Sequence, residues 1–490
     1  MISSVNLIRL ISAGLLLSLA CAGPGFADEN PTHDQVAATA VERMKLATEF
    51  VRTHVAVRGG YVYDVTLDLK QRRGEGVATA TEIWVQPPGT PTVGTAFVRA
   101  WEATGDPLFL DAAVECADAL LHGQLESGCW SDRVDFDPRG KNADVYRNGK
   151  GKSQGRNYST LDDDKSQSAL RLLIEVDRSL QFKNAAIHEA VGYGLAALLK
   201  AQFANGGFPQ GWNEPVEQLA VVKASYPEHD WRTEGRFKNY WDFATLNDGL
   251  AGTVTETLEL AFKTYQDERY QAALLKFGDF LILAQMPEPQ PAWAQQYNHQ
   301  LQPIWARKFE PAAISGRESE DVISTLMFLF EKTGERRFLE PIPAALEWLR
   351  RSLLPDGQIA RFYELQSNTP LYFVRNTYEL TYDDSQLPTH YSFKSKSSVN
   401  KLAERYKLLE SGQAVAPKLK SLKSLRKDSE EILFHQDAEG RWVTDKAGHA
   451  VKIVNEQDPS KLLIESKVFA ENMTDLAEFV KAVKLPPVAK

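Results

Sequence analysis

A helical periodicity that recurs in pairs constrains this chain more than any other feature of its sequence. Apolar residues between Val93 and Trp101 follow the i, i+3, i+4, i+7 pattern, and a second run from Leu110 to Leu121 repeats it. The stretch Thr104-Gly105-Asp106-Pro107 between the two runs consists of residues that favour turns. The pattern therefore predicts two amphipathic helices joined as a helical hairpin.

The same unit recurs along the chain. Helical hairpins are predicted at 92–123, 166–201, 246–285 and 319–353, with single helices at 35–53 and 465–483. A Gln-initiated segment ends the second helix of two hairpins in the same way, at 124–130 and 202–208. Hairpins that each bury one face can curl into a ring. The predicted fold class is all-α, an α/α toroid (an incomplete α/α barrel) with long loops; an irregular helical array is the alternative.

Short β-like segments lie outside the hairpins. Residues 61–65 and 79–85 read as strands before a Pro-rich break, and 132–160 reads as a long loop. In the last hundred residues, 431–435 and 441–443 are predicted strands around the turn 437–440. The predicted organisation is an N-terminal helical extension at 28–154, a toroid core at 155–395, and a small β element with a closing helix at 396–490.

The first 27 residues resemble a targeting signal. Arg9 precedes an apolar run, Leu10 to Ala20, that is too short to span a bilayer, and Gly25 and Ala27 fit a cleavage site. We expect a signal peptide at 1–27 and a periplasmic or secreted protein. A lipid anchor at Cys21 is the alternative. No later apolar run is long enough for a predicted membrane span.

Composition narrows the possible partners. The chain has 56 Lys and Arg against 65 Asp and Glu, a net charge of −9, which argues against a nucleic-acid partner that needs a basic surface. The motifs of zinc proteases, hydrolase nucleophile elbows and nucleotide-binding loops are absent from the sequence. Cys116 and Cys129 could form one disulfide or remain two thiols. We expect the protein to act as a monomer.

Two acidic segments open predicted helices. Thr160-Leu161-Asp162-Asp163-Asp164 precedes one, and Leu246-Asn247-Asp248-Gly249 precedes another. Aspartate at such a place can simply cap the helix. Alternatively, carboxylates from two hairpins meet in a cleft and hold a hard cation such as Ca²⁺, which prefers several oxygen ligands.

Basic and aromatic residues are interleaved in other loops. Arg307 and Lys308, Arg361 and Arg375 lie among aromatic residues that include Tyr363, and 226–241 is rich in both types and ends at Trp241. Guanidinium groups pair with carboxylates while rings stack on sugar faces, so the pattern suits a sugar acid. Helix packing in loops is the alternative.

Several stretches together resemble the pectic acid lyase family, the tenth polysaccharide lyase family. Thr160-Leu161-Asp162-Asp163 resembles the family's T-I-D-N, 206–210 its G-G-W-P-Q, and 244–248 its I-T-F-N-D. Further along, 306–310 resembles A-R-A-Y-E, 315–319 resembles S-G-x-E-S, and 360–364 reads A-R-F-Y-E as in the family. The resemblance covers about 155–395, which is the expected catalytic toroid.

The resemblance implies a pectate lyase that cleaves polygalacturonate by anti-β-elimination with Ca²⁺. It implies Arg361 as the base, Arg307 and Arg375 as binders of substrate carboxylates, and Asp162 and Asp248 as metal or active-site carboxylates. We add Asp163 to the metal ligands, and Lys308, Tyr363 and Trp241 to the substrate-binding residues. Asp163 departs from the family's Asn. A lyase for another uronate polymer, an inverting glycoside hydrolase and a noncatalytic acidic-glycan-binding protein remain alternatives.

Overall fold

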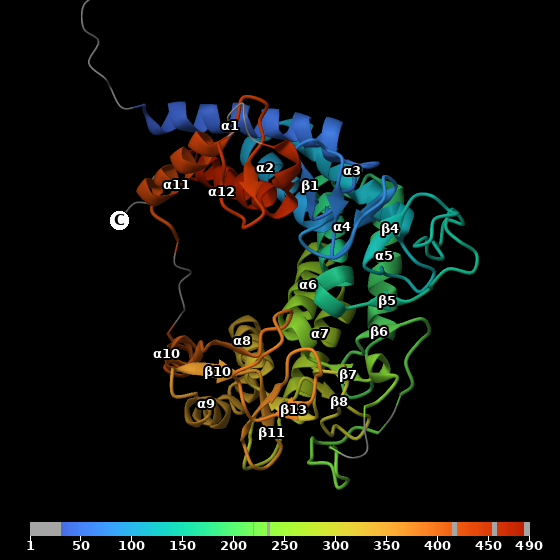
Figure 1. Ribbon diagram of the computed structural model, residues 1–490, viewed down its shortest axis with the longest axis vertical. Coiled ribbons are helices and arrows are strands. Elements are labelled where there is room, and N and C mark those ends of the chain that lie inside the picture. The colour runs from blue at the N-terminus through green and yellow to red at the C-terminus, as the bar shows by residue number, and fades with distance from the viewer. Residues whose placement is uncertain (1–30, 219, 233–235, 414–418, 453–457, 485–490) are drawn as a thin grey trace, which may run out of the picture.

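The helices form two concentric rows around an open ring (Figure 1). The computed structural model describes residues 31–218, 220–232, 236–413, 419–452 and 458–484. Successive inner helices pack against one another in the order α12 (Ser466–Lys484), α2 (Thr90–Thr104), α4 (Lys165–Ser179), α6 (Leu250–Tyr265), α8 (Gly316–Thr333) and α10 (Val399–Glu410). The outer row consists of α11 (Leu422–His435), α1 (His33–Phe50), α3 (Pro107–Gly123), α5 (Ala185–Lys200), α7 (Glu268–Leu283) and α9 (Ile342–Arg351). The predicted incomplete α/α toroid is confirmed.

The turns inside the hairpins follow a common design. The inner helices α2, α6 and α8 each end at a residue in the left-handed conformation, Gly105, Gln266 and Gly334. In two of these turns the next residue is an Asp that caps the outer helix: Asp106 accepts from the N–H of Leu108, and Asp267 accepts from that of Arg269. The left-handed residue reverses the chain and the Asp starts the next helix. The four predicted hairpins all have this inner-then-outer arrangement.

The outer helices are fastened by a recurring glutamine. Gln124 donates from Nε2 to the carbonyls of Gly128 and Ala190, closing its own loop and tying it to the next outer helix. Gln202 makes the equivalent bonds to Gly206 and Ala273. Each pair of bonds satisfies buried carbonyls that would otherwise be left without a donor. This device holds neighbouring hairpins at a fixed distance.

The predicted strand at 431–435 is wrong, because these residues form the last turn of α11. Gln436 follows this helix and donates to the carbonyls of Gly440 and Arg43, as Gln124 and Gln202 do in their own repeats. The indole of Trp442 donates back to the carbonyl of Ile432. Helix α11 is therefore the outer helix of a further repeat, and α10 is an inner helix that the sequence analysis also missed.

Every strand pair between described residues is antiparallel and short. One sheet joins the two ends of the chain in the order β15 (Val443–Asp445), β16 (Leu462–Glu465), β1 (Asp64–Thr66) and β2 (Arg72–Arg73). The others are β3 (Glu82–Trp84) with β4 (Arg133–Asp135), β5 (Ser159–Thr160) with β6 (Gly211–Trp212), β7 (Ala244–Thr245) with β8 (Gln296–Tyr297), β10 (Gln358–Ala360) with β14 (Lys394–Lys396), and the four-stranded β13 (Leu380–Thr381), β12 (Pro370–Phe373), β11 (Phe362–Glu364) and β9 (Ala313–Ser315). The predicted strands at 61–65 and 79–85 overlap β1 and β3.

One hydrophobic core runs through the whole ring, from Val36 in α1 to Val480 in α12. Cys116 and Cys129 are buried within it and both are free thiols. Among the described residues, no helix combines the length and apolar character needed to cross a membrane. The predicted signal peptide at 1–27, including Cys21, lies outside the described residues.

Candidate functional site

The site lies where the inner helices α4, α6 and α8 begin, and three successive repeats build it. In each repeat a short strand precedes the helix, and its Thr160, Thr245 or Ser315 donates its N–H to the carbonyl of an aromatic residue, Trp130, Phe208 or Trp293 respectively. The strand residue is therefore held in the same way in all three repeats, and α4 and α6 both begin five residues after it, whereas α8 begins at the next residue. Side chains beyond this point can be compared directly between the first two repeats.

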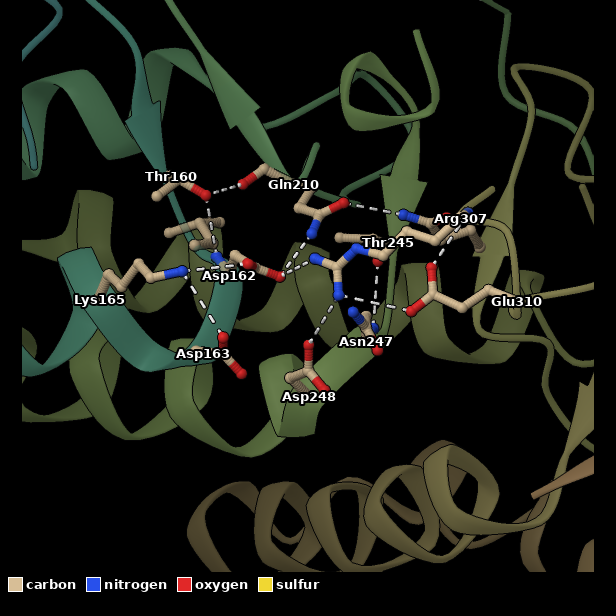
Figure 2. A network of polar contacts seen from close by, with 12 residues as sticks. Thr160, Asp162, Asp163, Lys165, Gln210, Thr245, Asn247, Asp248, Arg307 and Glu310 are labelled. Atoms are coloured by element: carbon tan, nitrogen blue, oxygen red, sulfur yellow. Dashed lines mark hydrogen bonds and ion pairs between the residues drawn. The ribbon is translucent and has the colours of Figure 1, made fainter. Parts of the chain in front are cut away.

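The acidic turns before α4 and α6 have the same geometry. Thr160 Oγ1 accepts from the N–H of Asp162, and Thr245 Oγ1 accepts from that of Asn247, each at 3.1 Å. The following residues, Asp163 and Asp248, have φ of 50° and 52°, a left-handed conformation that non-glycine residues seldom adopt. Carboxylate oxygens of Asp162, Asp163 and Asp248 lie within 4.8 Å of one another. The structure thus brings the three predicted metal ligands together (Figure 2).

An amide or guanidinium faces each of these turns from the neighbouring loop. The carbonyls of Gln210, Gln295 and Arg361 accept the N–H groups of Leu161, Leu246 and Gly316. The side chain of Gln210 donates to Asp162 and that of Gln295 donates to Asn247. In the third repeat the matching side chain is Arg361, and it donates to Glu318. Arg361 therefore takes the place that a glutamine holds in the two earlier repeats.

Arg307 links the repeats at the centre of the network. Its Nη2 lies 2.7 Å from Asp162 Oδ1, and its Nη1 lies 3.5 Å from Glu310 and 4.0 Å from Asp248 (Figure 2). Burial opposes the charge on Arg307, but Glu310 and Asp162 outweigh it and raise the pKa of Arg307. Arg307 is thus a permanent cation that crosslinks carboxylates from the turns that precede α4 and α6.

Arg361 is almost enclosed, with 3% of its side chain exposed. Its Nη2 lies 2.8 Å from Glu318 and 3.6 Å from Asp248, and the Tyr391 ring centre lies 4.2 Å from the guanidinium carbon. Burial would lower the pKa of Arg361, but Glu318 together with Tyr391 and the other carboxylates nearby outweighs it, and the net pKa is raised. Its Nε has no hydrogen-bond partner among the residues that the structure describes.

The carboxylates respond to the same charges in opposite ways. Burial raises the pKa of Asp162, but Lys165 and Arg307 outweigh it and the net pKa is lowered. Burial, followed by repulsion from Asp163 and Asp162, raises the pKa of Asp248 to about 7. Asp248 is therefore the carboxylate whose negative charge the protein accommodates least well.

Two hollows adjoin or approach this network. A pocket of about 430 Å³ is lined by Asp162, Arg307, Arg156, Tyr158 and Trp241, whose side chain is 40% exposed. A larger cavity of about 890 Å³ lies between α2, α4, α11 and α12 and is rich in carboxylates, among them Glu175, Glu256, Asp428, Glu431, Glu471 and Asp475. The smaller pocket contains the basic and aromatic groups that suit an acidic sugar, while the larger one would repel it.

Three predicted substrate-binding residues lie outside the network. Tyr363 is buried in the core, and its hydroxyl donates to the carbonyl of Ser352 and accepts from the N–H of Ala360. It has a structural role, and its predicted place in the substrate site is wrong. Lys308 is exposed with its ammonium over the Tyr378 ring. Arg375 is exposed and donates to the carbonyl of Leu387.

Sequence reasoning also missed residues of the network. Glu310 and Glu318 lie within the motifs used for the family resemblance, yet their charge partners were not foreseen. Lys165 contacts two of the three aspartates. Aligning the turn at Thr160 with that at Thr245 would have singled out Lys165, because the matching residue of the second repeat is Leu250.

A family model matches part of the chain. Residues 124–359 match the family model of pectic acid lyase, a region that contains Asp162, Asp248 and Arg307 and ends just before Arg361. No curated protein matches the sequence.

Solved structures of low identity also match. The Family 10 polysaccharide lyase from Cellvibrio cellulosa is 20% identical, with 67% of this chain and 97% of that chain covered and a TM-score of 0.46. A mutant of that lyase in complex with trigalaturonic acid is 19% identical, with 65% and 98% covered and a TM-score of 0.45. A cellobiose 2-epimerase from Spirochaeta thermophila is 14% identical, with 92% and 98% covered and a TM-score of 0.46.

The fold and the site define a toroidal protein with a carboxylate and guanidinium cluster at the entrance to its inner helices. The match to the family model covers 124–359, just under half of the chain. Over that region the chain is similar to the pectic acid lyase family.

Proposed function

We propose that this protein cleaves polygalacturonate by anti-β-elimination and uses a divalent cation, Ca²⁺, at Asp162, Asp163 and Asp248. The observation that carries the proposal is the charge balance of the network. Within the described residues, five carboxylates contact three cationic side chains, which leaves an excess of two negative charges once Asp248 is ionised. The groups are Asp162, Asp163, Asp248, Glu310 and Glu318 against Lys165, Arg307 and Arg361. One divalent cation would neutralise that excess.

The donor set fits calcium rather than a softer metal. Oxygens of three carboxylates lie within 4.8 Å of one another, and the ligand-bearing turns contribute no His or Cys. Calcium accepts such oxygen ligands in flexible geometry and keeps positions for further oxygens. When bound, it would offer positive charge to the uronate carboxylate of a substrate.

Side chains of the protein can bind the substrate carboxylate and remove the C5 proton. The proton on C5 of galacturonate is weakly acidic, and charge builds on the adjacent carboxylate as the proton leaves. Arg307, at the edge of the 430 Å³ pocket, can pair with that carboxylate. A base removes the C5 proton, the electron pair forms the C4–C5 double bond, and the C4–O bond breaks with its electrons on the departing oxygen.

We assign the base to Arg361. This role requires a neutral guanidine, which ordinary arginines do not provide, and Glu318 stabilises the charged form. Glu318 is also placed to hold the proton that Arg361 must release, since its carboxylate lies 2.8 Å from Nη2. A cation at Asp248 would cancel the second negative charge near the guanidinium, which lies 3.6 Å away.

The pocket beside Asp162 supports a sugar-binding role for Trp241. Its exposed ring shares the pocket with Arg156 and Arg307, so a ring and two guanidinium groups converge there. A polymer of galacturonate does not cross membranes, which agrees with the expectation that the protein is exported.

An ultraviolet assay tests the proposal. The full chain is incubated with polygalacturonate, with calcium or with a chelator, and the absorbance of the unsaturated product is followed. We expect absorbance that requires calcium and disappears in Arg361→Ala, while circular dichroism shows that the variant is folded. New reducing ends without absorbance would indicate hydrolysis, and binding without cleavage would indicate a noncatalytic protein. Cleavage of another uronate polymer without cleavage of polygalacturonate would show that the proposed substrate is wrong.

A further inference from the structure

Lys165 occupies an unusual position for a lysine. It is the first residue of α4 and only 6% exposed, and its Nζ lies 3.1 Å from Asp162 Oδ2 and 3.6 Å from Asp163 Oδ2 (Figure 2). Burying an ammonium is costly unless carboxylates compensate for the lost water. Its two partners belong to the three-carboxylate cluster, so its location is tied to that cluster.

The internal repeat shows that the fold does not require a charge at this position. Leu250 is the first residue of α6, follows Thr245 by the same spacing with which Lys165 follows Thr160, and is buried. A buried apolar side chain therefore starts the matching helix equally well. The ammonium of Lys165 has a function in the site rather than in the scaffold.

The contacts of Asp162 leave one of its two carboxylate oxygens as the ligand for a metal. Its Oδ1 already accepts from Arg307 and Gln210, and its Oδ2 faces Lys165. A cation that binds Asp162 within the cluster must take Oδ2 from the ammonium. Asp163 Oδ2 accepts from Gln86 at 3.2 Å and is the other oxygen that Lys165 approaches.

We infer that Lys165 competes with the divalent cation for Asp162 Oδ2: its ammonium contacts Asp162 and Asp163 in the metal-free protein and must give up the contact with Oδ2, while staying beside the cluster, when the metal binds. The inference rests on the metal site of the proposed function. It follows that the free protein binds calcium weakly. The oxygens of an arriving uronate then help to hold the metal, so that cation and substrate bind together.

Calcium titration calorimetry on the chelator-treated full chain tests this inference without an activity assay. We expect Lys165→Met to bind calcium roughly tenfold more tightly or better, because a unit charge and a divalent ion a few ångströms apart repel appreciably even at the dielectric of water. Lys165→Arg should retain the weak affinity. Lys263→Met is the matched control, because Lys263 pairs with Glu259 on α6 away from the cluster.

Thermal unfolding in chelator supplies a second readout. Lys165→Met should unfold at a lower temperature than the wild type and regain the difference in calcium; Lys165→Gln gives the same measurements if the Met variant does not fold. Equal calcium affinities of wild type and Lys165→Met, within twofold, would overturn the inference and leave the metal site standing. No calcium binding by either protein would overturn both. Tighter binding by Lys165→Met without cleavage of polygalacturonate by the wild type would overturn the proposed function alone.

Discussion

Among the three carboxylates of the proposed metal site, Asp248 should destabilise the metal-free protein most when it is ionised. Its pKa is raised from 3.8 to about 7 by burial and then by Asp163 and Asp162. The folded protein therefore holds a proton on Asp248 that the unfolded chain has released. Stability contributed by this group is complete below about pH 4 and is lost as the pH rises to about 7. Above that pH the metal-free protein carries the full penalty.

The size of the penalty follows from the shift. A change of about three pKa units corresponds to about 4 kcal/mol, and the side chain is only 19% exposed, so solvent screens it little. Asparagine has nearly the same shape and no charge. We expect Asp248→Asn to stabilise the metal-free protein at pH 8 by up to about 4 kcal/mol, and to leave its stability at pH 4 nearly unchanged.

Thermal and urea unfolding in chelator at pH 4, 6 and 8 measure this difference. Calcium should then stabilise the wild type at pH 8 and not Asp248→Asn, and the variant should lose calcium-dependent cleavage. Asp111→Asn is the control, since Asp111 is an exposed residue of α3. An Asp248→Asn variant that is no more stable than the wild type at pH 8 in chelator would show that repulsion among Asp162, Asp163 and Asp248 does not destabilise the folded protein.

Three further changes test the assignment of residues to scaffold or site. Tyr363→Phe should lower stability by about 1–3 kcal/mol in urea unfolding, because the Ala360 N–H and the Ser352 carbonyl lose their partner, and it should leave kcat/KM unchanged. Trp241→Ala should leave the stability unchanged and raise KM. Gln436→Ala should lower the free energy of unfolding by about 1–3 kcal/mol, as two buried carbonyls lose their donor. Burial lowers the pKa of His122 to about 4 in the folded protein. As the pH drops from about 6.5 towards 4, the unfolded chain therefore binds a proton that the folded protein does not, and stability falls. His122→Phe should show a smaller fall in Tm between pH 7 and 4.5.

The hairpins could be predicted from the sequence because their signals are local. Apolar spacing defines a helix face within one or two turns, and Gly105 with Asp106 marks a reversal without reference to the rest of the chain. The two acidic turns could be placed at one site for the same reason, since both precede an inner helix. The strand predicted at 431–435 failed because a short apolar run fits either a strand or a buried helix end.

The partners of the charged residues could not be predicted, because they depend on packing across the ring. Glu318 and Arg361 meet only because β9 pairs with β11, and Tyr391 reaches Arg361 from a loop that precedes β14. Tyr363 was assigned to the site from its motif, yet Phe362, Tyr363 and Glu364 are all buried in β11. A strand covered on both faces gives no alternation that would separate core from site.

Differences between the repeats identify the chemistry more sharply than any single motif. At the position that holds Gln210 and Gln295, Arg361 keeps the carbonyl bond to the segment at which the inner helix of the same hairpin begins, and only the side chain changes. Lys165 likewise replaces the leucine of the second repeat. A backbone bond that all the repeats share is explained by the fold. A charged side chain that appears in one repeat only, with the same backbone bond, is not required by the packing of the helices. We therefore propose that Arg361 and Lys165 both act in the site, because each stands where a matching repeat has an uncharged residue.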